Sequence, residues 1–195
     1  MTDPRQKWDD RYRQSDAEAG PGDAALVLTQ NAHLLPATGC ALDLACGLGA
    51  NALFMAQRGL SVSAWDISPV AIDRLRQVAA QHHLSLQLEV RDVMSQPPAL
   101  EQFDVIVVTR FLERQLASPL MEALKPGGLL FYQTFITDKV SDRGPDHCAY
   151  RLARNELLTL FSWLRILVYR EEGLVGTVQQ GFRDEALLVG QKTEC

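Results

Sequence analysis

The feature that most constrains the fold of this chain is the alternation of apolar, strand-length runs with segments of helical periodicity. The first run, Cys40–Leu44, leads through a glycine-rich turn into a helical segment, residues 51–58, that stops at Gly59, a common helix terminator. Strands that alternate with helices usually pair in parallel. This order therefore predicts an α/β fold with a doubly wound, Rossmann-like sheet.

The same alternation continues to the end of the chain. Further strands are expected at residues 61–65, 84–90, 103–109, 129–135, 164–170 and 184–190, and further helices at residues 68–82, 118–124 and 155–161. The segment 125–128 should form a turn, and residues 136–151, rich in Asp, Gly and Pro, a long loop. Three glycines within residues 171–183 favour a hairpin between the last two strands.

Length and composition indicate one soluble domain. The 195 residues suit a single hydrophobic core, and a 47% hydrophobic share with a net charge of −5 is ordinary for a globular chain. No apolar run reaches the roughly 20 residues that a bilayer requires, and net acidity argues against a nucleic-acid partner. The polar N-terminus has no signal-peptide core, and the four cysteines form no zinc-binding pattern with each other or with histidine. We therefore expect a cytoplasmic protein without a metal. The sequence does not indicate its oligomeric state.

The turn after the first strand combines glycines with a carboxylate. Gly47 and Gly49 let the backbone pass close to a ligand, at the edge of the sheet where α/β folds bind ligands. The spacing also fits a dinucleotide fingerprint, or a tight turn with no ligand. Asp43 would repel a pyrophosphate and attract a cofactor that carries positive charge and no phosphate. Alternatively, its carboxylate only accepts backbone N–H groups of the turn.

Two more carboxylates follow the next two strands. Asp66 comes 19 positions after Gly47, where a carboxylate can accept both hydrogen bonds from ribose hydroxyls. Its alternative role is a helix cap, but Ser68 is better placed for that. Asp92 could accept a hydrogen bond from the amino group of adenine, and the backbone N–H of Val93 could donate one to the same base. Aspartate is, however, also common in turns. The ends of three successive strands thus predict a nucleoside-binding edge.

At these residues the chain resembles the class I methyltransferases that depend on S-adenosylmethionine (SAM). The resemblance covers about residues 40–135 and rests on residues 42–49 (LDLACGLG), 64–66 (AWD), 103–106 (FDVI) and 124–128 (LKPGG). Ala45 stands where the commonest family pattern has a glycine, a departure that should leave the turn intact.

The resemblance implies SAM as the cofactor and a seven-stranded sheet in which only the last strand is antiparallel. It implies one methyltransferase domain over residues 1–195, with a segment that covers the cofactor (1–35), a SAM-binding core (40–135), and an acceptor-side loop with the last strands (136–195). Trp8 and Tyr12 would then lie near the methionine moiety, where aromatic faces suit a sulfonium. Trp8 could instead pack as a hydrophobic staple. The expected cofactor-binding residues of the core are Asp43, Ala45, Cys46, Gly47, Gly49, Asp66, Ile67, Asp92, Val93 and Thr109.

Within that superfamily the chain resembles the tellurite-resistance and thiopurine-type small-molecule methyltransferases. The resembling segments are residues 8–12 (WDDRY), 49–56 (GANALFMA), 62–66 (VSAWD), 155–161 (NELLTLF) and 169–172 (YREE). This implies a small-molecule acceptor with a soft nucleophile, such as a thiol, a selenol or a metalloid oxyanion.

Four residues are candidates for the acceptor side, and none is assigned as a catalytic base. Arg110 follows the fourth strand and could bind an anionic acceptor; alternatively it pairs with Glu113 or another carboxylate. Arg143, His147 and Tyr150 belong to the long loop, where His147 could act as a base near neutral pH. Each could instead be solvated.

Two other functions fit parts of the pattern. A nicotinamide-dependent oxidoreductase could use a similar sheet, but Asp43 opposes a pyrophosphate and the chain has no Tyr-x-x-x-Lys dyad. A non-catalytic SAM-binding protein would have a sealed or absent acceptor pocket.

Overall fold

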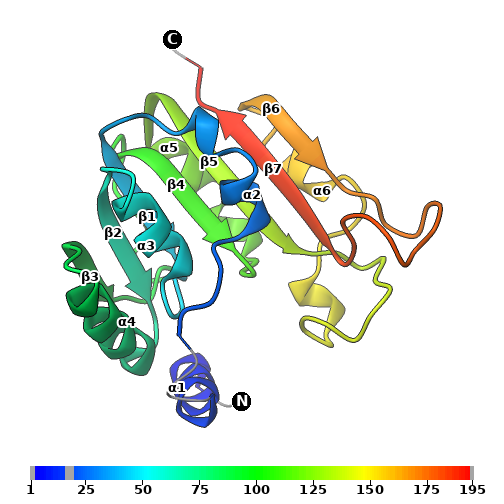
Figure 1. Ribbon diagram of the computed structural model, residues 1–195. Coiled ribbons are helices and arrows are strands. Elements are labelled where there is room, and N and C mark those ends of the chain that lie inside the picture. Colours follow the sequence, from blue (N-terminus) through cyan, green and yellow to red (C-terminus); the bar gives the residue numbers. More distant parts are fainter. Residues whose placement is uncertain (1–2, 16–19, 194–195) are drawn as a thin grey trace.

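The computed structural model of the protein describes residues 3–15 and 20–193, and its centre is one seven-stranded sheet in the order β3-β2-β1-β4-β5-β7-β6 (Figure 1). The strands are β1 (Cys40–Leu44), β2 (Ser61–Asp66), β3 (Leu86–Val90), β4 (Phe103–Thr109), β5 (Leu124–Phe135), β6 (Arg165–Arg170) and β7 (Glu185–Gln191). Neighbours from β3 to β5 pair in parallel, and β7 runs antiparallel to both β5 and β6. The predicted sheet, with only the last strand antiparallel, is confirmed.

Helices cover both faces of this sheet. The helices α2 (Leu26–Thr29), α3 (Ala50–Ala56) and α4 (Pro69–Gln81) pack on one face, and α5 (Ala117–Ala123) and α6 (Glu156–Leu160) on the other. Along β4, Val105 and Val107 pack in the hydrophobic core on the side of α2, α3 and α4, and Ile106 and Val108 pack in the core on the side of α5 and α6. This burial on both faces explains why the strand is apolar throughout. Within residues 3–15 and 20–193, no helix is both long enough and apolar enough to cross a membrane.

The remaining helical segments are short or terminal. They are α1 (Pro4–Gln14) and the 3₁₀ turns η1 (Ala32–Leu34), η2 (Arg114–Leu116) and η3 (Cys148–Tyr150). Asp3 caps α1 by accepting the N–H of Arg5 at 3.1 Å. Figure 1 shows α1 below the tips of the parallel strands, so it lies at their carboxyl edge.

The expected turn at residues 125–128 is part of β5. The pairing of β4 with β5 shifts its register between Phe103 and Val105, so the turn residues form an irregularity inside a continuous strand. The N–H of Gly127 donates to the carbonyl of Lys192 at 2.9 Å, and Lys125 pairs with Asp104 at 2.7 Å. These two partners hold the segment in the sheet. The other element boundaries differ from the expectations by one or two residues.

The order of the strands reverses between β1 and β4. In an open α/β sheet, ligands bind beyond the carboxyl ends of the strands at such a point. The glycine turn follows β1, Asp66 ends β2 and Thr109 ends β4. The fold thereby brings the predicted cofactor residues to one edge of the sheet.

Candidate functional site

The turn after β1 is tightly folded. Ala45, Gly47 and Gly49 all adopt left-handed backbone conformations, with φ of 54°, 54° and 83°. The N–H of Cys46 donates to the carbonyl of Trp65 at 3.0 Å, and the N–H of Gly49 to the carbonyl of Cys46 at 2.9 Å. The turn is intact despite Ala45, as expected, but an alanine in this conformation carries strain that a glycine would not.

The two glycines leave room for different neighbours. A Cβ atom on Gly47 would lie 2.9 Å from the hydroxyl of Tyr12, and one on Gly49 would lie 2.3 Å from Cδ1 of Leu75. Gly47 thus faces the N-terminal helix α1, on the side expected for the cofactor. Gly49 instead makes room for helix α4, a packing role that the sequence did not indicate.

Asp66 connects the glycine turn to the start of α4. One carboxylate oxygen accepts the N–H of Gly47 at 2.8 Å and the other the N–H of Ser68 at 2.9 Å. Ser68 caps α4 by accepting the N–H of Ala71, as predicted. Each carboxylate oxygen has two lone pairs, so Asp66 keeps acceptor capacity for ribose hydroxyls. Burial raises the pKa of Asp66.

Asp43 is completely buried beneath the turn. Its Oδ2 accepts the N–H of Ala52 at 3.0 Å. Asp43 therefore does bind a backbone N–H group, which was the alternative role considered for it. Its Oδ1 has no hydrogen-bond partner among the described residues. Burial raises the pKa of Asp43 to about 7, and the Asp66 carboxylate adds to this effect. A buried carboxylate with one oxygen that accepts no hydrogen bond is stabilised in its ionised form by nearby positive charge.

Helix α1 lies against this turn. The rings of Trp8 and Tyr12 are stacked with centroids 5.8 Å apart, and the pKa of Tyr12 is raised by burial and by Asp66. The hydroxyl of Ser68 donates to the buried Asp9, which anchors α1 on α4. The side of α1 that carries Tyr12 therefore forms one wall of the predicted cofactor site.

The other predicted cofactor residues have mixed surroundings. Asp92 is exposed and accepts the N–H of Met94 at 3.0 Å, while Val93 is buried. The hydroxyl of Thr109 accepts a hydrogen bond from the side chain of Asn51 at 2.9 Å. Ile67 is partly buried, and burial raises the pKa of the Cys46 thiol, which makes it a poor nucleophile. Within residues 3–15 and 20–193, no three His, Cys, Asp or Glu side chains gather where they could hold a metal ion.

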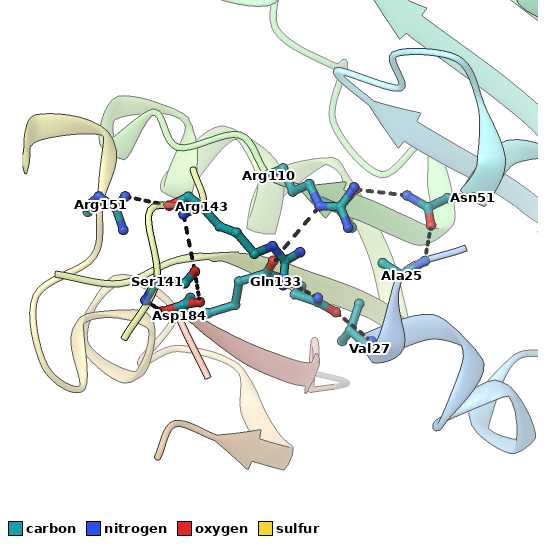
Figure 2. Close-up of polar contacts among 11 residues, drawn as sticks. Ala25, Val27, Asn51, Arg110, Gln133, Ser141, Arg143, Arg151 and Asp184 are labelled. Carbon is teal, nitrogen blue, oxygen red and sulfur yellow. Dashed lines mark hydrogen bonds and ion pairs between the residues drawn. The ribbon is translucent and has the colours of Figure 1, made fainter. Parts of the chain in front are cut away.

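The loop 136–151 is fixed at both of its ends (Figure 2). Asp184 accepts the N–H groups of Val140 and Ser141 and the hydroxyl of Ser141. The buried Arg151 donates to the carbonyls of Ile136, Arg143 and Pro145 at 3.0, 2.7 and 2.7 Å. The predicted loop is thus confirmed, and these hydrogen bonds constrain its conformation.

A cavity of about 270 Å³ lies between this loop and the segment after β4. Its lining residues are Leu112, Glu113, Arg114, His147, Ala149 and Tyr150. The rings of His147 and Tyr150 lie 6.0 Å apart, and Nδ1 of His147 accepts the N–H of Ala149 at 3.1 Å. Lys7 of α1 lies 5.9 Å from the Tyr150 ring. Two of the four acceptor-side candidates therefore share a cavity that α1 approaches.

The other two candidates, Arg110 and Arg143, meet at a carboxylate that the sequence did not single out. Glu185 lies 4.0 Å from Nε of Arg110 and 3.5 Å from the guanidinium of Arg143, and it also accepts a hydrogen bond from Gln133. Arg110 does pair with a carboxylate, but with Glu185 and not with Glu113. Polar residues at the ends of the otherwise apolar strands β5 and β7 are the signal that could have revealed this cluster.

The chain is similar in sequence to a methyltransferase domain and to several known proteins. A family model described as a methyltransferase domain matches residues 41–128. Hemagglutinin 1 of Eikenella corrodens is 30% identical over 140 residues, which cover 67% of this chain and 45% of that protein. The "probable S-adenosyl-L-methionine-dependent methyltransferase TehB" of Haemophilus influenzae is 28% identical over 138 residues, which cover 67% of this chain and 47% of that protein. The chain spans less than half the length of these relatives.

A solved structure shares the whole fold. The crystal structure of TehB from Haemophilus influenzae matches 97% of this chain and 67% of its own with a TM-score of 0.70. Since the identity is 22%, this likeness concerns the fold alone.

Proposed function

We propose that the chain is a class I SAM-dependent methyltransferase and that it transfers the methyl group of SAM to a small-molecule acceptor in the cytoplasm, since its residues 41–128 match a methyltransferase domain. When bound, SAM supplies a methyl group on a positively charged sulfonium. The work of the protein is then to align acceptor, methyl group and sulfur, and to exclude water.

The charge around the glycine turn is the observation that carries this proposal. Asp43 and Asp66 are both buried beside Gly47, at the ends of adjacent strands, and burial raises the pKa of each. A pyrophosphate would meet two carboxylates there, which argues against a nicotinamide dinucleotide. The sulfonium and α-ammonium of SAM would stabilise both ionised carboxylates, including the unpartnered oxygen of Asp43.

The remaining cofactor contacts follow from the sequence motifs. We assign the ribose hydroxyls to Asp66, and the adenine to Asp92 and the backbone N–H of Val93. Tyr12 lies beside Gly47 with its hydroxyl nearest, and Trp8 stacks on Tyr12, so we place the sulfonium next to this aromatic pair. The absence of a side chain at Gly47 lets the Tyr12 hydroxyl approach the turn, and we place the methionine moiety along this side of α1.

The chemistry of His147 favours an acceptor that needs no strong base. Because its Nδ1 accepts the N–H of Ala149, the neutral ring carries its proton on Nε2. With Nδ1 engaged in this contact, His147 offers a hydrogen-bond donor at Nε2 and no free acceptor nitrogen. Soft nucleophiles such as thiols, selenols or metalloid oxyanions fit this condition better than alcohols or amines. The cavity bordered by His147 and Tyr150 supports an enzyme over a non-catalytic SAM-binding protein.

Calorimetric titration with S-adenosylhomocysteine, with NAD and NADP in parallel, tests the proposal. We expect binding of S-adenosylhomocysteine alone, weakened by about 1–3 kcal/mol in Asp66→Ala with the fold intact. The matched control Asp73→Ala, at an exposed position of α4, should bind as the unmodified protein does. Binding of a dinucleotide, or of neither ligand, would overturn the proposal. If S-adenosylhomocysteine binds, methylation of thiols, selenols and oxyanions is the next assay.

A further inference from the structure

Glu185 is a buried carboxylate at the carboxyl edge of the sheet. It begins β7 opposite Phe135 of β5, and only 3% of the residue is exposed. One of its oxygens accepts a hydrogen bond from the buried Gln133, and the other faces Arg110 and Arg143. Figure 2 shows the side chains of Arg110 and Arg143 coming from different segments, one after β4 and one from the long loop, toward the same region near Gln133.

Two other arginines near the site have their guanidinium groups engaged in the fold. Arg114 donates to both carboxylate oxygens of Glu156 and to the carbonyls of Ala149 and Arg151. Arg151 donates to three carbonyls, as described above. These two side chains hold the loop, and their hydrogen-bonding capacity is largely used.

Arg110 and Arg143 differ in this respect. Their side chains are 58% and 60% exposed, and Glu185 is their contact among the described residues, at 4.0 and 3.5 Å. A guanidinium carries five N–H donors, so most donors of both groups are free. Asp184 is also close enough to Arg143 for that positive charge to lower its pKa, so the cluster offers a ligand exposed N–H donors and not a surplus of positive charge.

The backbones of both arginines are fixed. Arg110 adopts a left-handed conformation with φ of 53°, and its N–H donates to the carbonyl of Gln133 at 2.8 Å. The N–H of Arg143 donates to the hydroxyl of Ser141, and its carbonyl accepts from Arg151. A strained residue with a bulky side chain persists where its surroundings hold it, and such residues cluster at ligand sites.

We propose that Arg110 and Arg143, spaced by Glu185, bind one anionic group of the methyl acceptor, either a carboxylate or an oxyanion. The planar donor forks of arginine match such groups with paired hydrogen bonds. Arg110 follows Thr109 at the end of β4, beside the point where the strand order reverses, so a bound anion would lie at the edge that holds the cofactor. Glu185 acts as a positioning residue. The inference rests on the proposed methyl transfer, because it names the acceptor class of the same site.

The test is calorimetric titration of the full chain with anions, with and without saturating S-adenosylhomocysteine. The probes are acetate and benzoate for carboxylates, and sulfate and selenite for oxyanions, with chloride keeping the ionic strength constant. We expect saturable binding of one anion, weakened about ten-fold or more in Arg110→Gln and in Arg143→Gln. Arg165→Gln, which removes the same charge from an exposed position at the start of β6, should bind as the unmodified protein does. If the carboxylates bind more tightly than the oxyanions, the acceptor carries a carboxylate; if the oxyanions bind more tightly, it carries an oxyanion.

The outcomes separate the two proposals. Binding of S-adenosylhomocysteine without arginine-dependent anion binding overturns the inference and leaves the proposed function standing. Anion binding through the two arginines without S-adenosylhomocysteine binding overturns the proposed function. In Glu185→Gln the arginines lose their fixed spacing, so the preference for acetate over chloride should fall. An unchanged preference would remove Glu185 from the proposal.

Discussion

The side chain of Leu75 occupies the space that a side chain on Gly49 would need. A Cβ atom on Gly49 would lie 2.3 Å from Cδ1 and 2.5 Å from Cδ2 of Leu75, which is completely buried in α4. The second glycine of the turn therefore sets how closely α4 approaches the first strand. A turn that looks from its sequence like a ligand loop is also a packing element.

We predict that Gly49→Ala destabilises the protein by about 2–4 kcal/mol, because the left-handed backbone and the overlap with Leu75 both oppose a methyl group. Urea unfolding measures the loss. Removing the overlap in Leu75→Ala should make the glycine substitution less harmful, so the double variant should be more stable than the sum of the single losses predicts. Additive losses would mean that Leu75 is not the obstacle.

Ala45 offers the opposite case. It adopts φ of 54° where a glycine would be relaxed, so Ala45→Gly should stabilise the folded protein by about 1 kcal/mol after the greater flexibility of unfolded glycine is deducted. Thermal or urea unfolding measures the gain. The control change Ala56→Gly, at the helical residue that ends α3, has no left-handed strain to relieve and should give no such gain. A loss of stability in Ala45→Gly would show that the turn needs the methyl group.

The sheet could be predicted because its signals are local. An apolar run such as β4 indicates a strand buried on both faces, and the glycines before β7 indicate a hairpin. The short helix α2 gave no such signal. Its first N–H groups are taken by the side chains of Asn51 and Gln133, which are 26 and 106 positions away from their partners. No window of sequence contains that information.

The same distinction applies to the site. Asp43 and Asp66 could be placed at one edge because Asp43 is the next-to-last residue of β1 and Asp66 the last residue of β2, and these two strands are parallel neighbours. The cluster of Arg110, Arg143 and Glu185 depends on β7 returning antiparallel beside β5, which brings Glu185 opposite Phe135. Which carboxylate an arginine meets is a property of the tertiary fold.

We predict that Arg114 stabilises the loop wall of the cavity that we propose for the acceptor. In Arg114→Gln, the contacts to Glu156 and to the carbonyls of Ala149 and Arg151 are lost or weakened. Amide hydrogen exchange in residues 147–151 should accelerate, and stability should fall by about 1–2 kcal/mol because the pair is partly exposed. Arg154→Gln, which removes an exposed pair with Asp138, should leave exchange in that segment unchanged. Equal effects of the two changes would exclude a specific role for Arg114.

Asp43 should make stability and cofactor binding depend on pH in opposite directions. Its pKa rises from 3.8 to about 7 on folding because of burial, so between these values the folded protein holds a proton that the unfolded chain has released. The stability that this proton contributes is complete below pH 3.8 and is lost as the pH rises through about 7. Asp66, whose pKa is also raised by burial, contributes in the same direction. A positively charged cofactor favours the ionised carboxylate, so SAM should bind more tightly at pH 8 than at pH 6 and should release protons on binding.

Asp43→Asn provides the decisive comparison for this pH dependence. In this variant both stability and SAM binding should depend less on pH. Unfolding experiments from pH 4 to pH 8 should give a flatter stability curve, and calorimetry in buffers of different ionisation enthalpy should detect fewer protons released on SAM binding. Asp73→Asn, at an exposed position on α4, is the matched control and should keep both pH dependences. If Asp43→Asn keeps them too, then Asp43 is not the group that titrates, and Asp66 becomes the carboxylate that links SAM binding to pH.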